Sequence, residues 1–373
     1  MIDNSQIYRV GGYVRDKLLG MNANDCDYVV VGSTPEEMLR HGFTQVGRSF
    51  PVFLHPQTKE EYALARCEKK ISSGHTGFVV YASPDVTLEE DLKRRDITIN
   101  AIAEDCHGAL IDPYGGLSDL QNHTIRHVSE AFSEDPLRIL RVARFATKLN
   151  FSIATETRTL LKTMATTSDI YTISRERIIE ELNKSLSFTQ SSIFFITLRE
   201  VNCLDKFFPS MQNIMNNDYL WDKLRTITQT SANVNTKLFY LGMLYHEANL
   251  SSHLAEIINS SKIITSINKG LVLLDFDIGN LTSQIILEKF KQLDIWRNYN
   301  RFLEVLELYD SYVTKFAEQK NKVNTIKQLA ASLHHVDLKS AIATSAPHDI
   351  AIKIKQQYLA IIDKFKLGIV NHD

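Results

Sequence analysis

The sequence predicts an α+β protein in which an N-terminal mixed α/β part is followed by helices alone. Over the first 128 residues, short apolar runs of strand type alternate with short helical patterns, and turns rich in glycine and proline separate them. We expect these strands to form one mixed sheet of about five strands. From about residue 129 the strand-type alternation stops, and apolar residues recur at helical spacing. A chain of 373 residues is long enough for two or three domains.

Composition favours a globular protein of a reducing compartment. Hydrophobic residues make up 44% of the chain and charged residues 23%, which are ordinary values. No apolar run approaches the ~20 residues that a membrane span needs, and the first residues do not resemble a secretory signal. The four cysteines show neither a CxxC pair nor metal-ligand spacing, so we expect a cytoplasmic setting. We expect neither a membrane nor an obligatory protein partner.

The overall charge limits the kind of ligand surface. The formal net charge is −2, which disfavours a uniformly basic nucleic-acid-binding protein. One basic face, balanced by acidic residues elsewhere, remains compatible with this value.

The stretch 7–32, IYRVGGYVRDKLLGMNANDCDYVVVG, carries the strongest chemical signal. An apolar strand ends at Gly11-Gly12, a helix follows, and a polar loop leads to a second strand that carries Asp25 and Asp27. Glycines let a phosphate approach the backbone, and the helix start, together with Arg15, offers N–H groups to the same anion. Residues two apart on a strand point the same way, so the two aspartates can hold divalent cations side by side.

Each of these features alone is common, but their order is specific. It resembles the active-site signature of the DNA polymerase β nucleotidyltransferase superfamily. The longer pattern GGYVRDKLLG…DCDYVVVG is similar to the branch that holds the class II tRNA nucleotidyltransferases (CCA-adding enzymes) and bacterial poly(A) polymerases. The resemblance implies that Asp25 and Asp27 are catalytic and bind Mg²⁺, and that Gly12 and Arg15 bind nucleotide.

The resemblance extends through five motifs over about the first 190 residues and implies a division of the chain. Residues 1–128 would form the nucleotidyltransferase head and residues 129–195 a helical neck that selects the nucleotide. Residues 196–373 would form a helical body and tail that bind tRNA.

Two further segments of the expected head bear on the site. On the strand EEYALAR, Glu61 is either an exposed edge residue or a third carboxylate near the metals, because relatives place an acid at the matching position. Residues 67–92 are polar and interrupted by Gly74, Gly77 and Pro84, so we expect a flexible segment without regular structure.

The stretch RRDITINAIA (94–103) resembles a second family motif. Outside this context, Arg94-Arg95-Asp96 would be an ordinary surface charge cluster. Within it, we expect Arg95 to bind the triphosphate, because a guanidinium contacts phosphate oxygens in a bidentate manner.

The helix expected in SEDPLRILRVARFATKLNF presents Asp135, Arg138, Arg141 and Arg144 at every third position. Asp135 before a proline can simply cap the helix, and the arginines can form a solvated face. Alternatively, Asp135 and Arg138 as neighbours can read a base edge, since cytosine and adenine both present an NH₂ donor beside a ring-nitrogen acceptor. EDPLR resembles the nucleotide-selecting motif of the class II enzymes, which implies the second role and nucleotide binding by all four residues.

The rest of the chain reads as amphipathic helices. SRERIIEELNKSL (174–186) resembles the fifth family motif, and we interpret its role as bracing the selecting helix. HLAEIINSSKIITSI is expected to be one helix. Lysines scattered through the last sixty residues suit either an RNA backbone or a solvated face.

The resemblance implies template-independent addition of CCA to the 3′ end of tRNA from CTP and ATP, with Mg²⁺ and release of pyrophosphate. A poly(A) polymerase, or an enzyme that adds only A or only CC, shares every motif above. A more distant alternative is a non-catalytic RNA-binding protein on the same scaffold, which the intact aspartates and Arg15 disfavour.

Overall fold

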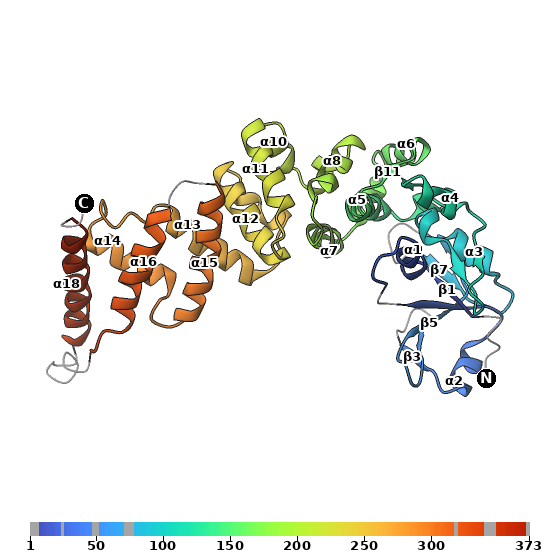
Figure 1. Cartoon of the computed structure of the whole chain (residues 1–373), viewed down its shortest axis with the longest axis horizontal. Coiled ribbons are helices and arrows are strands. Elements are labelled where there is room, and N and C mark those ends of the chain that lie inside the picture. The colour runs from blue at the N-terminus through green and yellow to red at the C-terminus, as the bar shows by residue number, and fades with distance from the viewer. Residues whose placement is uncertain are drawn as a thin grey trace. The chain divides into compact units, whose positions relative to one another are not determined.

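The chain folds into two compact units, residues 1–212 and residues 213–373. The computed structural model describes residues 7–23, 26–46, 52–70, 78–316, 320–338 and 348–370. All the strands it describes lie in the first unit, and the described part of the second unit is helical (Figure 1).

The first unit is built on a mixed sheet of seven strands in the order β3-β4-β5-β2-β1-β8-β9. Within it β2 and β5 are parallel, and the other neighbouring pairs are antiparallel. Two small sheets, β6-β7 and β10-β11, stand beside it. The strands are β1 (Ile7–Val10), β2 (Asp27–Val30), β3 (Thr44–Val46), β4 (Val52–Leu54), β5 (Glu61–Leu64), β6 (Cys67–Lys70), β7 (Phe78–Tyr81), β8 (Ala103–Glu104), β9 (Leu110–Ile111), β10 (Thr124–Ile125) and β11 (Ser152–Ile153).

Alternation along the strands gives the sheet two apolar faces. Val10 and Val29 pack on one face with Leu92 of α3 (Leu88–Lys93), and Val30 and Leu64 pack on the other with Met38 of α2 (Pro35–Arg40). The helices of this unit are α1 (Gly12–Leu18), α2 (Pro35–Arg40), α3 (Leu88–Lys93), α4 (Gly116–Gln121), α5 (Arg138–Leu149), α6 (Thr155–Met164), α7 (Arg175–Leu186), α8 (Ser192–Glu200) and α9 (Leu204–Phe207). Its 3-10 turns are η2 (Thr98–Asn100), η3 (Glu130–Glu134) and η4 (Ser168–Thr172). Helix α5 packs against α7 and α8, and it also contacts β10.

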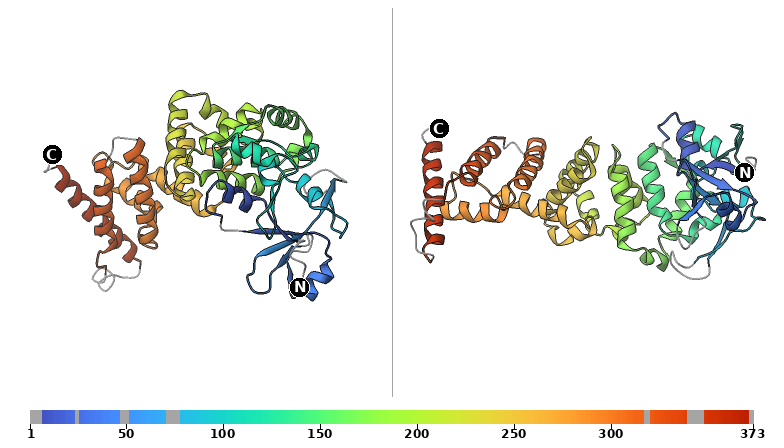
Figure 2. Two further views of the ribbon diagram at one scale, coloured as in Figure 1. Left: turned by 45° about the vertical axis from the view of Figure 1, so that its right-hand side comes forward. Right: turned by 90° about the horizontal axis from the view of Figure 1, so that it is seen from below.

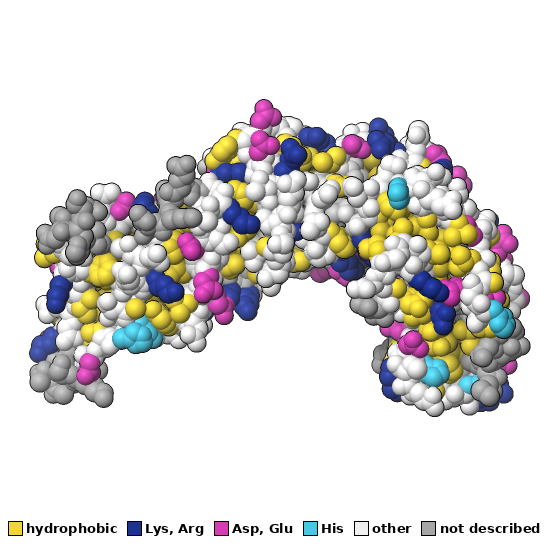
Figure 3. Space-filling model, viewed as in Figure 1, with side chains coloured by type: hydrophobic (Ala, Val, Ile, Leu, Met, Phe, Trp, Pro, Cys, Tyr) yellow, Lys and Arg dark blue, Asp and Glu magenta, His cyan; other side chains and the backbone are white. Residues whose placement is uncertain are grey.

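The second unit is a series of helices that pack mostly against their neighbours in the chain (Figure 2). A short helix, α10 (Met211–Met215), spans the division between the units. The others are α11 (Asp218–Gln229), α12 (Val234–Glu247), η5 (Ser251–Glu256), α13 (Ser261–Leu274), α14 (Ser283–Leu293), α15 (Tyr299–Phe316), α16 (Lys320–His334) and α18 (Ile350–Val370). On the face shown in Figure 3, basic side chains of this unit stand singly among apolar and acidic ones.

The structure confirms the α+β class with a mixed sheet followed by helices. The helix after the second strand, α2, begins with a capping box, because the Thr34 side chain accepts from the Glu37 N–H and the Glu37 carboxylate accepts from the Thr34 N–H. The sheet is wider than the five strands expected. The additional strands include β8 and β9, which have only two residues each and therefore give almost no periodic signal.

Two expectations were wrong. Residues 67–92 were expected to lack regular structure, but β6 and β7 pair as an antiparallel hairpin and α3 follows. The run FVVY in β7 consists of strong strand formers, and these outweigh the glycines before them, while residues 71–77 lie outside the described residues. The expected helix HLAEIINSSKIITSI is divided into η5 and α13, because Asn259 and Ser260 precede a new helix start rather than continue the first.

No helix in the described ranges is both long enough and apolar enough to cross a membrane.

Candidate active site

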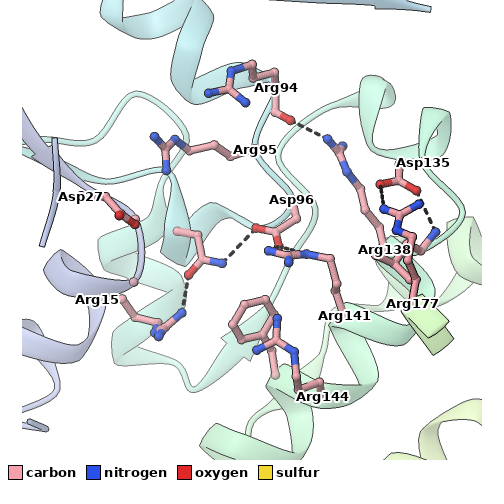
Figure 4. Close-up of a pocket in the computed structure, with 15 residues that line it drawn as sticks. Arg15, Asp27, Arg94, Arg95, Asp96, Asp135, Arg138, Arg141, Arg144 and Arg177 are labelled. Carbon is pink, nitrogen blue, oxygen red and sulfur yellow. Dashed lines mark hydrogen bonds and ion pairs between the residues drawn. The ribbon is translucent and has the colours of Figure 1, made fainter. Parts of the chain in front are cut away.

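A cavity of about 490 Å³ opens in the first unit between the Gly-Gly turn, the start of β2, the segment after α3, and helices α5 and α7 (Figure 4). Its lining holds seven arginines and three aspartates, a surplus of four positive charges in a chain whose net charge is −2. The arginines are Arg15, Arg94, Arg95, Arg138, Arg141, Arg144 and Arg177, and the aspartates are Asp27, Asp96 and Asp135. Such a concentration of guanidinium groups suits a phosphate-rich ligand.

The Gly-Gly turn forms one wall of the cavity. Gly11 has φ of 74°, a conformation that favours glycine. A Cβ on Gly11 would come within 3.0 Å of Arg95 Nη1, so this position keeps the guanidinium against the backbone of the turn. The turn and Arg95 therefore present N–H groups to the same space.

One nitrogen of the Arg95 guanidinium is held by an ion pair, and another has no hydrogen-bond partner in the part of the chain that the structure describes. Its Nη2 donates to Asp91 Oδ2 at 3.1 Å, whereas its buried Nε has no hydrogen-bond partner among the described residues. The same Asp91, which is fully buried, binds Arg94 Nη2 at 2.8 Å and the Arg66 N–H at 3.3 Å. Burial raises the pKa of Asp91, but the guanidinium groups of Arg94 and Arg95 outweigh it, so the pKa is lowered and the carboxylate stays charged.

Asp27 lies at the opposite end of the cavity from Asp135 in the view of Figure 4. It is the first residue of β2, and its Cα is paired with that of Val10, directly before the Gly-Gly turn, and with that of Glu61 on β5. Directly opposed residues of neighbouring strands point to the same face, so Asp27 and Glu61, both exposed, share one side of the sheet. Asp25 lies outside the described residues. Within the described ranges, no cluster of three His, Cys, Asp or Glu side chains could hold a metal ion.

Arg15 lies at the inner side of the Gly-Gly turn and is 3% exposed. Its Nε donates to Asp16 Oδ1 at 2.8 Å, and its Nη1 donates to Asn100 Oδ1 at 2.5 Å. Lys148 also binds Asp16, through Oδ2 at 2.8 Å. The Arg15 guanidinium is therefore fixed at the cavity wall by two side chains.

Asp96 occupies the centre of the lining and is 7% exposed. Its Oδ2 accepts from Arg141 Nε at 2.8 Å and Nη2 at 2.6 Å, and its Oδ1 accepts from Asn100 Nδ2 at 2.9 Å. Burial would raise the pKa of Asp96, but the charge of Arg141 and the bond from Asn100 lower it well below its ordinary value. Asp96 in turn raises the pKa of Arg141. This ion pair is charged at any pH near neutrality.

The other α5 arginines are anchored in different ways. Arg138 Nη2 donates to the Arg94 carbonyl at 2.6 Å, and its Nη1 donates to the Ala131 carbonyl at 3.1 Å. Arg144 Nε donates to Glu181 Oε2 of α7 at 2.6 Å, and its guanidinium lies 4.2 Å from the Phe145 ring centroid. These contacts hold the guanidinium groups at the cavity wall without covering them completely.

Helix α5 has Leu137 as its N-cap and no side-chain bond at that cap, so Asp135 acts in the turn before the helix, and it also lines the cavity. Its Oδ1 accepts the Leu137 N–H at 3.0 Å, in the turn that precedes α5. Its Oδ2 lies 3.4 Å from Arg177 Nη2 of α7. The carboxylate is thus oriented by one backbone donor and one charged side chain.

The structure brings together in this one cavity every expected site residue that it describes: Gly12, Arg15, Asp27, Arg95, Asp135, Arg138, Arg141 and Arg144. Sequence reasoning did not single out Asp96, Asn100 or Arg177. Asp96 and Asn100 stand in the quoted RRDITINA motif, so a signal existed for both. Arg177 stands in the quoted stretch SRERIIEELNKSL, which we interpret as bracing the selecting helix. Its partner Asp135 is 42 residues away in the chain, so the pair itself left no local signal.

The fold is that of a nucleotidyltransferase. The profile of the poly A polymerase head domain family matches residues 7–126, and that of the family described as "Probable RNA and SrmB- binding site of polymerase A" matches residues 150–215.

Closer relatives define the particular family. The CCA-adding enzyme of Alteromonas mediterranea is 41% identical, and the match covers 91% of this chain and 94% of that protein. The CCA-adding enzyme of Actinobacillus succinogenes is 38% identical, and the match covers 96% of this chain and 98% of that protein. This chain belongs to the family of CCA-adding enzymes.

A solved structure agrees at the level of the fold. The Bacillus stearothermophilus CCA-adding enzyme in complex with CTP has a TM-score of 0.64 to this chain and 23% identity. The match covers 96% of this chain and 89% of that one.

Proposed function

We propose that this chain adds C, C and A in turn to the 3′ end of tRNA, from CTP and ATP and without a nucleic-acid template. The observation that carries the proposal is the cavity in which Asp27 faces seven arginines, in a chain of the CCA-adding family. In each step the 3′-hydroxyl of the RNA attacks the α-phosphorus, the bond to the β-phosphate oxygen breaks, and pyrophosphate leaves.

Asp25 and Asp27 are proposed to hold Mg²⁺. The donor set fits a hard cation, because the Asp27 carboxylate lines the cavity and a second carboxylate, Glu61, is its partner across the strands. When bound, Mg²⁺ stabilises negative charge on the reacting phosphate groups.

The triphosphate is proposed to lie against the Gly-Gly turn. There the cavity is lined by Gly12 and by Arg15 and Arg95. Each donates hydrogen bonds to phosphate oxygens, and the guanidinium charges offset those of the ligand.

The base is proposed to lie at the Asp135 end. Asp135 would accept from the exocyclic NH₂ of cytosine or adenine, and Arg138 would donate to the adjacent ring nitrogen. Uracil and guanine present a carbonyl beside a ring N–H, and this reversed order leaves both side chains mismatched. Arg141 and Arg144, held by Asp96 and Glu181, complete the nucleotide-binding wall.

The roles of the larger segments follow the same proposal. Residues 1–128 act as the catalytic head, residues 129–195 as the selecting neck, and residues 196–373 as the body and tail that hold tRNA. The single chain would act without a protein partner, in the cytoplasm, where tRNA is processed.

The decisive experiment uses the purified chain with three tRNA transcripts, ending before CCA, after CC and after CCA. Each labelled nucleoside triphosphate is supplied alone and in combination. We expect CTP to extend the first transcript by two, ATP to extend the second by one, and no extension of the third. Long A tails would support the poly(A) polymerase alternative. Addition of only CC or only A would identify a partial enzyme, and absence of any addition would overturn the proposal.

We expect Arg95→Ala to weaken the use of CTP and ATP by a similar factor, on the order of 10- to 100-fold in kcat/KM, because the triphosphate is common to both. Arg126→Ala is the matched control, since it removes an arginine that pairs with Asp119 and does not line the cavity. Steady-state kinetics with each nucleotide measure the effect. A loss confined to one nucleotide would contradict the assignment of Arg95 to the triphosphate.

A further inference from the structure

Asn100 links Arg15, behind the Gly-Gly turn, to Asp96 at the centre of the cavity lining. Its Oδ1 accepts from Arg15 Nη1 at 2.5 Å, and its Nδ2 donates to Asp96 Oδ1 at 2.9 Å. Asp96 continues the chain to Arg141, so four side chains link α1, behind the Gly-Gly turn, to the middle of α5. The links span 85 and 45 residues of sequence, so no local structure enforces them.

The orientation of the Asn100 amide is fixed by the charges of the two side chains that it contacts. Its oxygen faces a guanidinium and its NH₂ faces a carboxylate. A rotated amide would place N–H groups against Arg15 and an oxygen against Asp96, which loses both charge-assisted bonds. Asn100 is 7% exposed, so water does not readily replace either bond.

The segment that carries Asn100 also accepts hydrogen bonds from two arginines of α5. The Arg94 carbonyl accepts from Arg138, and the Asp96 carboxylate accepts from Arg141. On the other side, the contact from this segment to Arg15 passes through Asn100. A shift of this one amide would therefore change where α5 and its base-facing side chains stand relative to the Gly-Gly turn.

We propose that Asn100 is a positioning residue that holds the base-selecting arginines of α5 in register with the phosphate-binding turn. This inference rests on the proposed function. Asn100 need not touch the nucleotide. It sets the distance between the place where the base is read and the place where the α-phosphorus reacts, and a mismatch there costs turnover more than binding.

The test compares Asn100→Leu with Thr98→Val in the same 3-10 turn. Leu keeps the size of the side chain and removes both bonds. Thr98 is 2% exposed and donates to Asp119 Oδ2 at 2.7 Å, away from the cavity lining, so Thr98→Val removes a comparable buried bond from a carboxylate. Asn100→Asp is a second variant, which keeps an acceptor for Arg15 and loses the donor to Asp96.

Single-nucleotide addition with CTP, ATP, UTP and GTP is measured beside melting curves. For Asn100→Leu we expect kcat/KM with CTP and ATP to fall about 10- to 100-fold, mostly in kcat. We expect the preference over UTP and GTP to relax by roughly tenfold. Asn100→Asp should show the same relaxation. Thr98→Val should keep wild-type selectivity, even if its melting temperature falls as far as that of Asn100→Leu.

The selectivity ratio does not depend on the folded fraction, so a general loss of stability cannot mimic the result. Wild-type selectivity in both Asn100 variants would overturn the positioning role while leaving the proposed function intact. A wild-type protein that adds no nucleotide would overturn the proposed function and this inference with it.

Discussion

We expect Asp27→Ala to lower nucleotide addition by at least about 10³-fold, because this carboxylate would hold Mg²⁺ at the reacting phosphorus and that contribution is worth several kcal/mol. The strand register places Asp27 across from the residue that precedes the Gly-Gly turn, so a metal bound there reaches phosphates held by that turn. The measurement is single-turnover addition of CTP to a tRNA transcript that lacks CCA.

The fold should survive this change. Asp27 is exposed at the start of its strand, and substitutions at such positions usually shift stability by less than ~0.5 kcal/mol. Melting curves and tRNA binding serve as controls and should match the wild type. Near-normal turnover by a folded Asp27→Ala protein would exclude this residue from the metal site.

The same assay decides the role of Glu61. If Glu61 is a third metal ligand, Glu61→Gln lowers addition by a factor comparable to that of Asp27→Ala, since its Cα is the partner of Asp27 across the parallel strands. If it is an edge residue, the variant behaves like the wild type, because exposed glutamates contribute little to stability.

The parts of this protein that the sequence predicts well are those set by neighbours in the chain. The cap of α2 depends on Thr34 and Glu37, three residues apart, and both bonds of the capping box are present. The Gly-Gly turn, α1 and β2 follow one another in the chain, and the register between β1 and β2 then brings Asp27 to the turn.

The parts that the sequence did not predict depend on distant pairs. Asp96 reads as a surface charge until Arg141, 45 residues later, is known to lie against it. We interpret residues 174–186 as bracing the selecting helix, and α7 packs on α5, but nothing near Arg177 in the chain identifies it as the partner of Asp135. Periodicity reports which face of a helix is buried, but it does not report which charges of two helices meet.

Asp135→Asn separates the two roles open to Asp135, which are accepting the Leu137 N–H before α5 and reading the base. Asn accepts a backbone N–H about as well as Asp, so the cap on the Leu137 N–H should persist. The ion pair with Arg177 is lost, but both side chains are about a quarter exposed, at 24% and 27%, so the effect on stability should be small. We therefore expect a melting temperature close to that of the wild type.

Selectivity should change far more than stability. The Asn amide also carries donors, so it can turn its NH₂ toward the carbonyl of uracil or guanine, which the carboxylate rejects. We expect the use of UTP and GTP relative to CTP and ATP to rise by about tenfold or more. The measurement is addition of each of the four nucleotides to transcripts that end before CCA and after CC.

Asn217→Asp provides the control for the cap. Asn217 accepts the Leu220 N–H at 3.1 Å at the start of α11, and it is not among the residues that line the cavity. Exchanging Asn for Asp there therefore measures the difference in stability between the two residues at a helix cap alone. If Asp135→Asn and Asn217→Asp both leave nucleotide choice unchanged, Asp135 serves only as a cap. The choice of C and A would then lie with Arg138 and the other arginines of α5, because their guanidinium groups line the rest of the cavity at the Asp135 end.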